Sequence, residues 1–248
     1  TEHDGIVNYR VRDIENIGNK IIPIFEKYPL LSFKYFDFLK FKEVFEILKN
    51  SKEFPIGEER NKRINEIISK DFSITHSTNL NWLYLLNDNM KCSPVWGKTN
   101  ISDIERVDKE YWKSKITKPW LIGFIEAEGS LYITKKEDKR YSHGFGIIKK
   151  KDRIILEGIK QIFKIPSTVR KKELHNYYLL DNTNSRVNLD LIEYFKDSFK
   201  GIKSLQYSIW ARSLRKSMNI SNVQERAQYL KEIQEKLRNL IEKEKFLP

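Results

Sequence analysis

Glu126 and Glu128 stand two residues apart at the end of an apolar stretch, PWLIGFIEAEGSLYI, over 119–133. The residues before them have the character of a helix too apolar to face water, and strand-like residues follow. A carboxylate at the carboxyl end of a helix meets the negative end of the helix dipole, and a bound cation would relieve that penalty. Carboxylate oxygens suit Mg²⁺ or Ca²⁺, so the pair is a candidate metal site; the alternative is a surface turn with two solvated glutamates.

The helix that must position these carboxylates is expected over 116–127. Gly123 and Ala127 lie four residues apart among large apolar residues, a spacing that lets two helix backbones approach closely. We therefore expect a partner helix on this face, with Glu128 presented at the end of the helix interface.

Both ends of this helix carry local signals. Pro119 falls in the first turn, where its missing N–H does no harm, and Thr117 can cap the start. Gly129 can adopt the left-handed conformation that often ends a helix. Beyond it the pattern predicts a hairpin over 130–150, a helix over 152–163, a second hairpin over 167–182, and helices over 186–199 and 204–218.

Two segments of the chain, 19–48 and 189–218, share one pattern of apolar residues around a lysine, Lys34 in the first and Lys203 in the second. Each predicts a short helix, a turn and a second amphipathic helix. On this repeat, the counterpart of LIGFIEAEGS in the first copy would fall before residue 1. We expect that counterpart to be absent, disordered or supplied by another molecule, such as a protein cofactor that completes the first half.

The repeat divides the chain into four parts. We expect the remainder of the first repeat over 1–54, the end of that repeat plus a linker over 55–115, the second repeat over 116–220, and an amphipathic helix over 221–248. The second part contains a predicted helix, EERNKRINEIISK, and a loop around 92–99.

The composition favours a polyanionic partner. The net charge is +12 and the pI is about 9.5, which indicates nucleic acid first, an anionic membrane second, or a basic surface kept for solubility. No apolar run is long enough to span a bilayer, so we expect no membrane partner. The single cysteine excludes an internal disulfide framework, and the four histidines never fall at a metal-ligand spacing.

The sequence LIGFIEAEG, followed by SLYI, resembles the signature of the LAGLIDADG family of homing endonucleases and group I intron maturases. Leu121, Gly123, Ile125, Ala127 and Gly129 match it letter for letter, while glutamates replace its aspartates. The resemblance implies an α+β, pseudo-symmetric saddle of two αββαββα half-domains, the first of them N-terminally incomplete. The antiparallel sheets of such a saddle form a nucleic-acid-binding groove.

The resemblance also implies a metal site. Glu128 stands where the family places its metal-binding carboxylate and Glu126 at the earlier acidic position, which has a supporting role. Both are therefore candidate ligands of Mg²⁺ or another divalent cation. Phosphodiester hydrolysis needs a metal-activated water and positive charge near the phosphate, and no side-chain nucleophile is evident.

Four basic residues are further catalytic candidates by the same resemblance. Lys203 in GIKSL and Lys34 in SFKYF resemble the lysine that helps to order active-site water in each half. In FGIIKKKDR, Arg153 falls at an arginine position beside the scissile phosphate. Lys149 falls where the family has a glutamine and is a departure from the pattern.

Basic, polar and aromatic residues alternate in the two predicted hairpins. We expect one face of a twisted sheet to carry Tyr132, Thr134 and Lys136, with alternate residues packing beneath. Such a face could contact base edges and phosphates, although a solvated hairpin is the alternative for any single residue. The candidate nucleic-acid-binding residues are Tyr132, Thr134, Lys135, Lys136, Lys139, Arg140, Arg170, Lys171 and Lys172.

Three functions fit these observations. The first is an intron-encoded, site-specific, divalent-metal-dependent endonuclease of double-stranded DNA; cleaving both strands would need the missing acidic segment or a partner. The second is an RNA maturase that binds and folds a group I intron without cleaving DNA, with which Lys149 and the long linker are compatible. The third is a DNA-binding regulator that no longer cuts. Residues encoded by AT-rich codons are abundant, and with the resemblance they indicate an organelle-encoded, mitochondrial protein.

Overall fold

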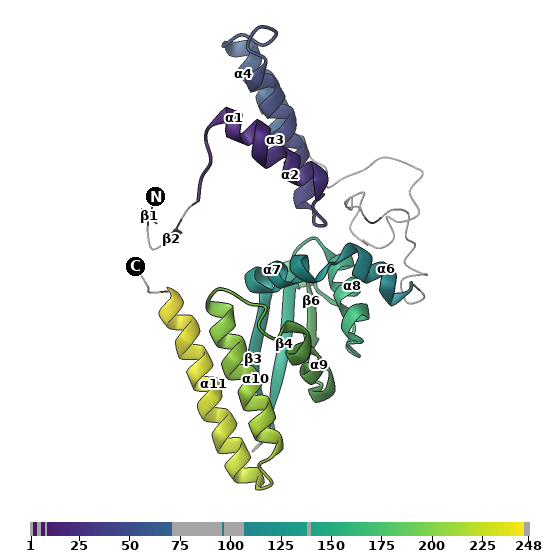
Figure 1. Ribbon diagram of the computed structural model, residues 1–248, viewed down its shortest axis with the longest axis vertical. Coiled ribbons are helices and arrows are strands. Elements are labelled where there is room, and N and C mark those ends of the chain that lie inside the picture. The colour runs from purple at the N-terminus through teal and green to yellow at the C-terminus, as the bar shows by residue number, and fades with distance from the viewer. Residues whose placement is uncertain are drawn as a thin grey trace. The chain divides into compact units, whose positions relative to one another are not determined.

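The computed structural model describes residues 2–3, 6–7, 9–70, 96, 107–137 and 140–245 (Figure 1). The chain forms two compact units, a helical unit over Asn8–Arg106 and a sheet unit over Thr1–Val7 and Val107–Pro248. The loop expected at 92–99 lies outside the described residues except for Trp96, and the candidate Lys139 lies outside them as well.

The sheet unit is built on four antiparallel strands in the order β3-β4-β6-β5. The strands are β3 (Gly129–Glu137), β4 (Arg140–Lys149), β5 (Arg170–Lys172) and β6 (Tyr177–Asn182). Leu131 and Ile133 are buried, whereas Tyr132 and Thr134 between and after them are half-buried. Because side chains alternate between the faces of a strand, this pattern fixes which face of β3 meets the core. A separate two-stranded ladder pairs β1 (Glu2–His3) with β2 (Ile6–Val7).

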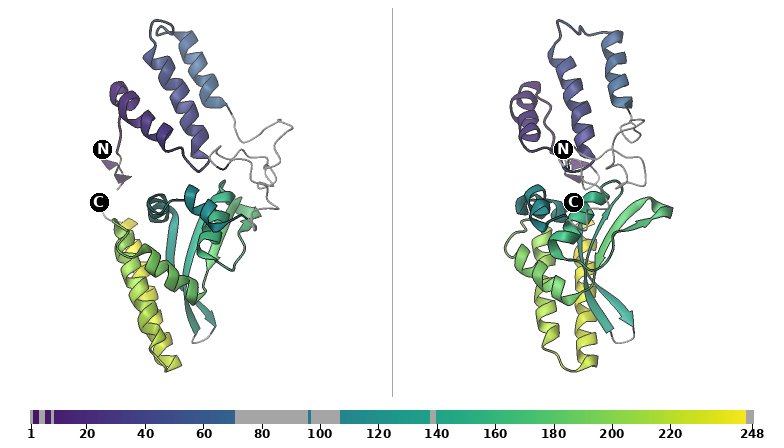
Figure 2. Two further views of the ribbon diagram at one scale, coloured as in Figure 1. Left: turned by 45° about the vertical axis from the view of Figure 1, so that its right-hand side comes forward. Right: turned by 90° about the vertical axis from the view of Figure 1, so that its right-hand side faces the viewer.

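Helices cover one face of the four-stranded sheet. They are α8 (Arg153–Phe163), α9 (Ser185–Phe195), α10 (Ile202–Met218) and α11 (Val223–Lys245), and Figures 1 and 2 show α9, α10 and α11 on the same side of the strands. Ile155, Ile159, Leu191 and Trp210 fill the layer between helices and strands. The observed order of helices and strands confirms the α+β arrangement predicted for this part of the chain.

The helix that carries the two glutamates is α7 (Lys118–Glu128), which follows the short α6 (Lys109–Lys115). Pro119 lies in its first turn as predicted, and Thr117 is the N-cap residue without a side-chain cap hydrogen bond. The prediction of a left-handed Gly129 is wrong, because its φ of −76° and ψ of 144° are extended and it begins β3. Glycine is needed there for space: a Cβ atom would lie 2.6 Å from the side chain of Ile125 and 2.7 Å from its carbonyl oxygen.

Polar side chains under the sheet tie two helices to β4. The buried His143 Nε2 lies 2.7 Å from Ser213 Oγ on α10, and Asn188 Nδ2 on α9 donates to the His143 carbonyl at 3.0 Å. Asn182 Nδ2 in turn donates to Asn188 Oδ1 at 2.8 Å. Burial lowers the pKa of His143 to about 4, so the imidazole is neutral at pH 7. His143 is thus a core residue rather than a surface one.

Strand β3 forms one edge of the sheet, and α11 packs against it. Leu230 of α11 is buried, and Gln234 Nε2 donates to the Ile133 carbonyl at 2.6 Å. From α10, the Trp210 indole donates to the Tyr132 carbonyl at 3.1 Å. Side chains of two helices therefore bind backbone carbonyls of the edge strand.

The helical unit has no strand among the residues described in it. Its elements are α1 (Ile14–Asn16), the π-helix η1 (Ile17–Ile21), α2 (Ile22–Lys27), α3 (Lys34–Lys49) and α4 (Glu58–Ser69). Ile22, Phe38 and Phe45 form its small core. The helices predicted in 19–48 and in EERNKRINEIISK are present as α2, α3 and α4. Among the described residues of either unit, none of the helices combines the length and the apolar character that crossing a membrane requires.

Candidate active site and nucleic-acid interface

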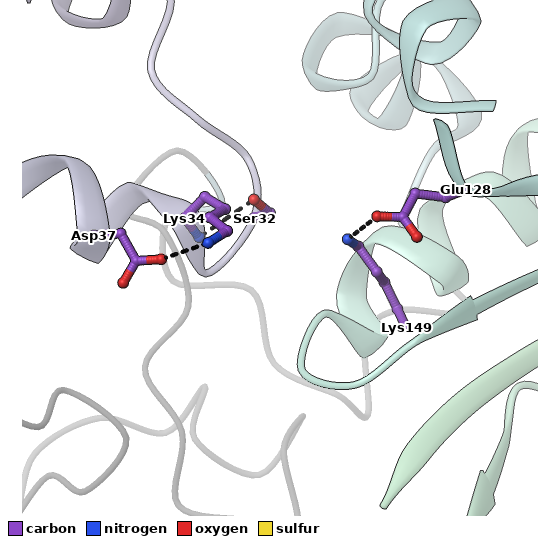
Figure 3. Close-up of polar contacts among 5 residues, drawn as sticks. All are labelled: Ser32, Lys34, Asp37, Glu128 and Lys149. Carbon is purple, nitrogen blue, oxygen red and sulfur yellow. Dashed lines mark hydrogen bonds and ion pairs between the residues drawn. The ribbon is translucent and has the colours of Figure 1, made fainter. Parts of the chain in front are cut away.

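Glu128, the last residue of α7, forms an ion pair with Lys149, the last residue of β4. Glu128 Oε1 lies 2.5 Å from Lys149 Nζ, and the two side chains are 36% and 22% exposed (Figure 3). The Lys149 ammonium also lies 5.6 Å from the centre of the Phe124 ring, within reach of a cation–π interaction. The candidate metal ligand and the residue that departs from the family pattern are therefore direct partners.

Glu126 is directed at a different target. Its Oε1 accepts hydrogen bonds from the backbone N–H groups of Lys200 at 2.7 Å and Gly201 at 2.9 Å, at the start of α10. The N–H of Gly201 and then that of Lys200 lower the pKa of Glu126 below its ordinary value. Residues two apart on a helix do not face each other, which explains why Glu126 and Glu128 separate. In the part of the chain that the structure describes, no three His, Cys, Asp or Glu residues gather as a metal site.

Lys203, the second residue of α10, lies beside the same junction of α7 and β3. Its Nζ donates to the carbonyl of Gly129 at 2.7 Å, one residue beyond Glu128. Lys149 and Lys203 therefore both bring positive charge to the carboxyl end of α7, where the helix dipole favours cations. Two lysines thus supply positive charge at the helix end where the sequence predicts a metal ion.

The described contacts of Arg153 lie within its own helix, and Lys34 belongs to the helical unit. Arg153, the first residue of α8, donates from Nε to Glu157 Oε1 at 3.1 Å. Lys34 begins α3 of the helical unit, and its 75% exposed side chain binds Asp37 Oδ2 at 2.9 Å (Figure 3). The structure thus brings Glu126, Glu128, Lys149 and Lys203 to one junction and leaves Arg153 in a helical ion pair.

The sheet face opposite the helices carries part of the predicted binding set. The pairing of Tyr132 with Gly144 and of Leu179 with Arg170 places Tyr132 and Arg170 on this open face, together with Thr134 and Lys172. Lys135 and Lys171 pair with Tyr141 and Tyr178, so they lie on the opposite face, as strict alternation requires. Lys136 lies at a register shift in β3. Arg140 is the first residue of β4, and its Nη1 lies 3.8 Å from Glu137 Oε1.

The open face also holds a carboxylate that the sequence analysis missed. The Tyr132 hydroxyl donates to Asp181 Oδ1, and Arg170 Nη2 lies 3.9 Å from Asp181 Oδ2. Burial and then Asp181 raise the pKa of Tyr132 above its ordinary value, so the hydroxyl remains a donor. Gly144 makes room for the tyrosine, because a Cβ atom there would lie 2.3 Å from its ring. The alternation in YYLLDN was the signal that could have placed Asp181 on this face.

The sequence profile of the LAGLIDADG endonucleases matches residues 1–45 and 121–214, more than half of the chain. The chain belongs to the LAGLIDADG endonuclease family. In this LAGLIDADG chain the first matched segment contains Lys34. The second contains Lys203, the matching lysine of the repeat, and the Glu128–Lys149 ion pair.

Two fungal relatives carry related names. "Probable intron-encoded endonuclease Cox1-I1b" of Schizosaccharomyces pombe is 34% identical over 223 residues, which cover 88% of this chain and 49% of that protein. "Probable intron-encoded endonuclease aI3" of Kluyveromyces lactis is 25% identical over 215 residues, which cover 85% of this chain and 50% of that protein. The LAGLIDADG chain described here therefore spans about half the length of these relatives.

Solved structures resemble this chain in fold. Meganuclease I-SmaMI bound to uncleavable DNA has a TM-score of 0.65 at 19% sequence identity. The matched region is 91% of this chain and 73% of the I-SmaMI chain. The I-LtrWI LAGLIDADG homing endonuclease bound to target DNA has a TM-score of 0.64 at 23% sequence identity. The matched region is 91% of this chain and 72% of the I-LtrWI chain. The likeness confirms the predicted fold class, the α+β fold of the LAGLIDADG endonucleases.

Proposed function

We propose that this chain is the DNA-binding and catalytic part of an intron-encoded, site-specific endonuclease that uses a divalent cation to cleave double-stranded DNA. The observation that carries the proposal is the junction of α7 and β3, where Glu128 lies with Lys149 and Lys203 beside a sheet with an open, partly basic face. The names of the two fungal relatives, both probable intron-encoded endonucleases, and the DNA bound in the similar structures support it.

The donor chemistry at Glu128 suits a divalent cation. Its carboxylate is a hard oxygen ligand, and 36% of the side chain is exposed at the carboxyl end of α7. We assign Glu128 as the metal ligand, with Mg²⁺ as the expected ion, and Glu126 as the supporting residue that holds α10 against α7. When bound, the cation would supply positive charge to the phosphate and favour deprotonation of a nucleophilic water.

The basic residues of the chain provide the remaining electrostatics. Lys203 donates to the Gly129 carbonyl beside Glu128, and in this proposal its ammonium would stabilise negative charge on a phosphate bound there. We assign Lys149 and Arg153 to the phosphate of the same half. Lys34 would serve a second phosphate in the first half, whose acidic helix end is not among the described residues. Cleavage of both DNA strands therefore requires that second acidic helix end.

The open face of the sheet is the proposed DNA contact. Tyr132, Thr134, Arg170 and Lys172 share it, and Lys136 and Arg140 extend it toward the end of the β3–β4 hairpin. Side chains on a sheet can reach base edges in the major groove while lysines and arginines bind phosphates. Because phosphate contacts release counterions, binding should weaken steeply as salt rises.

We further propose that the protein is encoded in, and acts in, a mitochondrion. Two observations support this localisation: the abundance of residues with AT-rich codons, and the intron-encoded relatives from fungi.

The test is strand cleavage of the sequence at which the intron is inserted. The full chain with Mg²⁺ should cut at least one strand of that DNA, and Glu128→Gln should lower the rate about a hundredfold or more. Glu235→Gln on the exposed surface of α11 removes the same charge elsewhere and is the matched control. Rescue of intron splicing that tolerates Glu128→Gln, without DNA cleavage, would contradict the proposal and indicate a maturase.

A further inference from the structure

Lys149 is held on two sides by residues of α7. Glu128 Oε1 lies 2.5 Å from its Nζ, and the Phe124 ring centre lies 5.6 Å away. Phe124 and Glu128 are four residues apart on one helix, so they form neighbouring parts of one surface. With only 22% of its side chain exposed, Lys149 loses more hydration than a typical surface lysine, which makes its contact with the carboxylate harder to replace by water.

Two other oxygens at this junction are also engaged. Glu126 Oε1 accepts two backbone N–H groups, and the Gly129 carbonyl accepts the Lys203 ammonium. We therefore take Glu128 rather than Glu126 as the carboxylate that receives the cation at the end of α7, and one of its oxygens already contacts Lys149. A Mg²⁺ ion binds carboxylate oxygen at about 2.0–2.1 Å. It would lie only a few ångströms from the ammonium and be repelled by it.

We propose that Lys149 is an internal counter-ion of Glu128 that competes with the divalent cation for this carboxylate. This inference rests on the proposed function insofar as that function places a cation at Glu128. In the absence of DNA, Lys149 occupies the carboxylate and keeps metal affinity low. A DNA phosphate offers the ammonium a second anionic partner, so that metal entry at Glu128 and phosphate binding by Lys149 become coupled.

The position of Lys149 permits this exchange of partners. Its backbone is fixed in the sheet by pairing with Tyr178 of β6, while its side chain has four flexible methylene groups. The ammonium can therefore leave Glu128 without a change in the strand. If Lys149 had a purely structural role, its release from Glu128 would instead lower the stability of the protein.

Direct metal binding tests the competition without measuring cleavage. Mn²⁺ is titrated into the full chain without DNA and followed by electron paramagnetic resonance. We expect Lys149→Met and Lys149→Gln each to bind Mn²⁺ roughly tenfold more tightly than the wild type, because a close like charge is removed. Lys149→Arg keeps the charge and should remain weak, and Glu128→Gln should abolish the gain in a double variant with Lys149→Met.

The matched control is Lys150→Met, which removes the same charge from the adjacent exposed residue. It should tighten Mn²⁺ binding less than about threefold, since its charge is solvent-screened. Unchanged, weaker or undetectable Mn²⁺ binding by both Lys149 variants would overturn the proposal. An equal gain in Lys150→Met would overturn it too, because the effect would then be one of net charge.

Acetylation of Lys149 gives a second readout. An amine-reactive acetylating reagent, quantified at Lys149 by mass spectrometry, should modify the residue several times faster in Glu128→Gln or at saturating Mg²⁺, since either frees the ammonium. Equal modification in all states would argue against competition. Neither experiment depends on DNA cleavage, so failure of the proposed endonuclease activity and failure of this inference are separate results.

Discussion

Helices α9 and α10 of the sheet unit and helices α2 and α3 of the helical unit share a sequence pattern but differ in what covers them. Trp210 of α10 is fully buried against the sheet, whereas Phe41, its counterpart in α3, is 44% exposed. Leu48 of α3 is also exposed, at 39%, although Ser217 at the equivalent place in α10 is buried. The face of α3 thus has the apolar composition of a sheet-covered helix, with no sheet among the residues described in its unit.

The two lysines at matching positions of the repeat, Lys34 and Lys203, show the same difference. Lys203 binds the Gly129 carbonyl beside Glu128, while Lys34 binds Asp37 within its own helix. The position of the lysine in the repeat is the same, but its partner is the carbonyl that follows another helix in one unit and a carboxylate of its own helix in the other. The comparison teaches that the repeat encodes the helices but does not fix the contact that the lysine makes.

The largest expected effect concerns Trp210. Replacing it by alanine should destabilise the sheet unit by about 3–5 kcal/mol, because it leaves a cavity under the sheet, while Phe41→Ala should cost less than about 1 kcal/mol. Hydrogen exchange at the amides of β3 and β4, and of α3, read by mass spectrometry, gives the stability of each unit. Equal losses would mean that α3 is covered as fully as α10.

A second difference between the units lies in their response to acid. Burial lowers the pKa of His143 to about 4, below the ordinary value of about 6.5. The unfolded chain therefore binds the proton more readily, so this contribution to stability is complete above pH 6.5 and is lost as the pH falls toward 4. The loss should reach roughly 3 kcal/mol for the sheet unit.

His143→Gln, which has no titrating group, should remove this part of the acid sensitivity. Urea unfolding followed by tryptophan fluorescence at several pH values between 7 and 4 measures it. Residues 9–70 of the helical unit contain neither histidine nor tryptophan, so they contribute neither to this titration nor to the fluorescence signal. An unchanged pH profile in the variant would show that carboxylates alone account for the acid sensitivity.

The two matching lysines of the repeat give a third comparison. Lys203→Met should lower the rate of strand cleavage about a hundredfold, because a positioned charge near the phosphate is lost. Lys34→Met should change it less than about threefold, since the exposed Lys34 side chain is paired with Asp37 of its own helix. Nicking of DNA labelled at either end resolves the two strands. Equal losses on one strand would indicate that both lysines serve the same phosphate.

The smallest expected effect concerns the start of each second helix. Glu126→Gln weakens two charge-assisted hydrogen bonds to the start of α10 and should cost about 1 kcal/mol. Ser32→Ala removes one longer contact, from the Lys34 N–H at 3.3 Å, and should cost roughly 0.5 kcal/mol. Thermal unfolding of the two variants compares them, and a larger loss in Ser32→Ala would contradict the supporting role of Glu126.

Local periodicity was enough to predict the elements of the sheet unit. The α7 helix, both hairpins and the α9–α10 pair follow from spacing within short windows, as does the burial of Leu131 and Ile133. The alternation of side chains along a strand also predicts that Lys135 and Tyr132 lie on opposite faces of the sheet. Strict use of this rule would have excluded Lys135 from the open face and included Asp181.

The contacts at the candidate site could not be predicted in this way. The Glu128–Lys149 pair depends on where β4 ends relative to α7, and the bond from Gly201 to Glu126 joins residues far apart in the sequence. A register shift of one residue would send Lys149 to the other face of the sheet. Gly129 illustrates a related difficulty, because a glycine that avoids a clash with Ile125 has the same letter as one that ends a helix.

The covered edge of the sheet has a consequence for how copies of this protein meet. Unpaired strand edges are templates on which a second chain can add its own strand, and long exposed edges promote aggregation. Here α11 lies against β3 and Gln234 engages its backbone, while β5 at the other edge is only three residues long. The sheet therefore offers little free strand edge for strand exchange between neighbouring molecules.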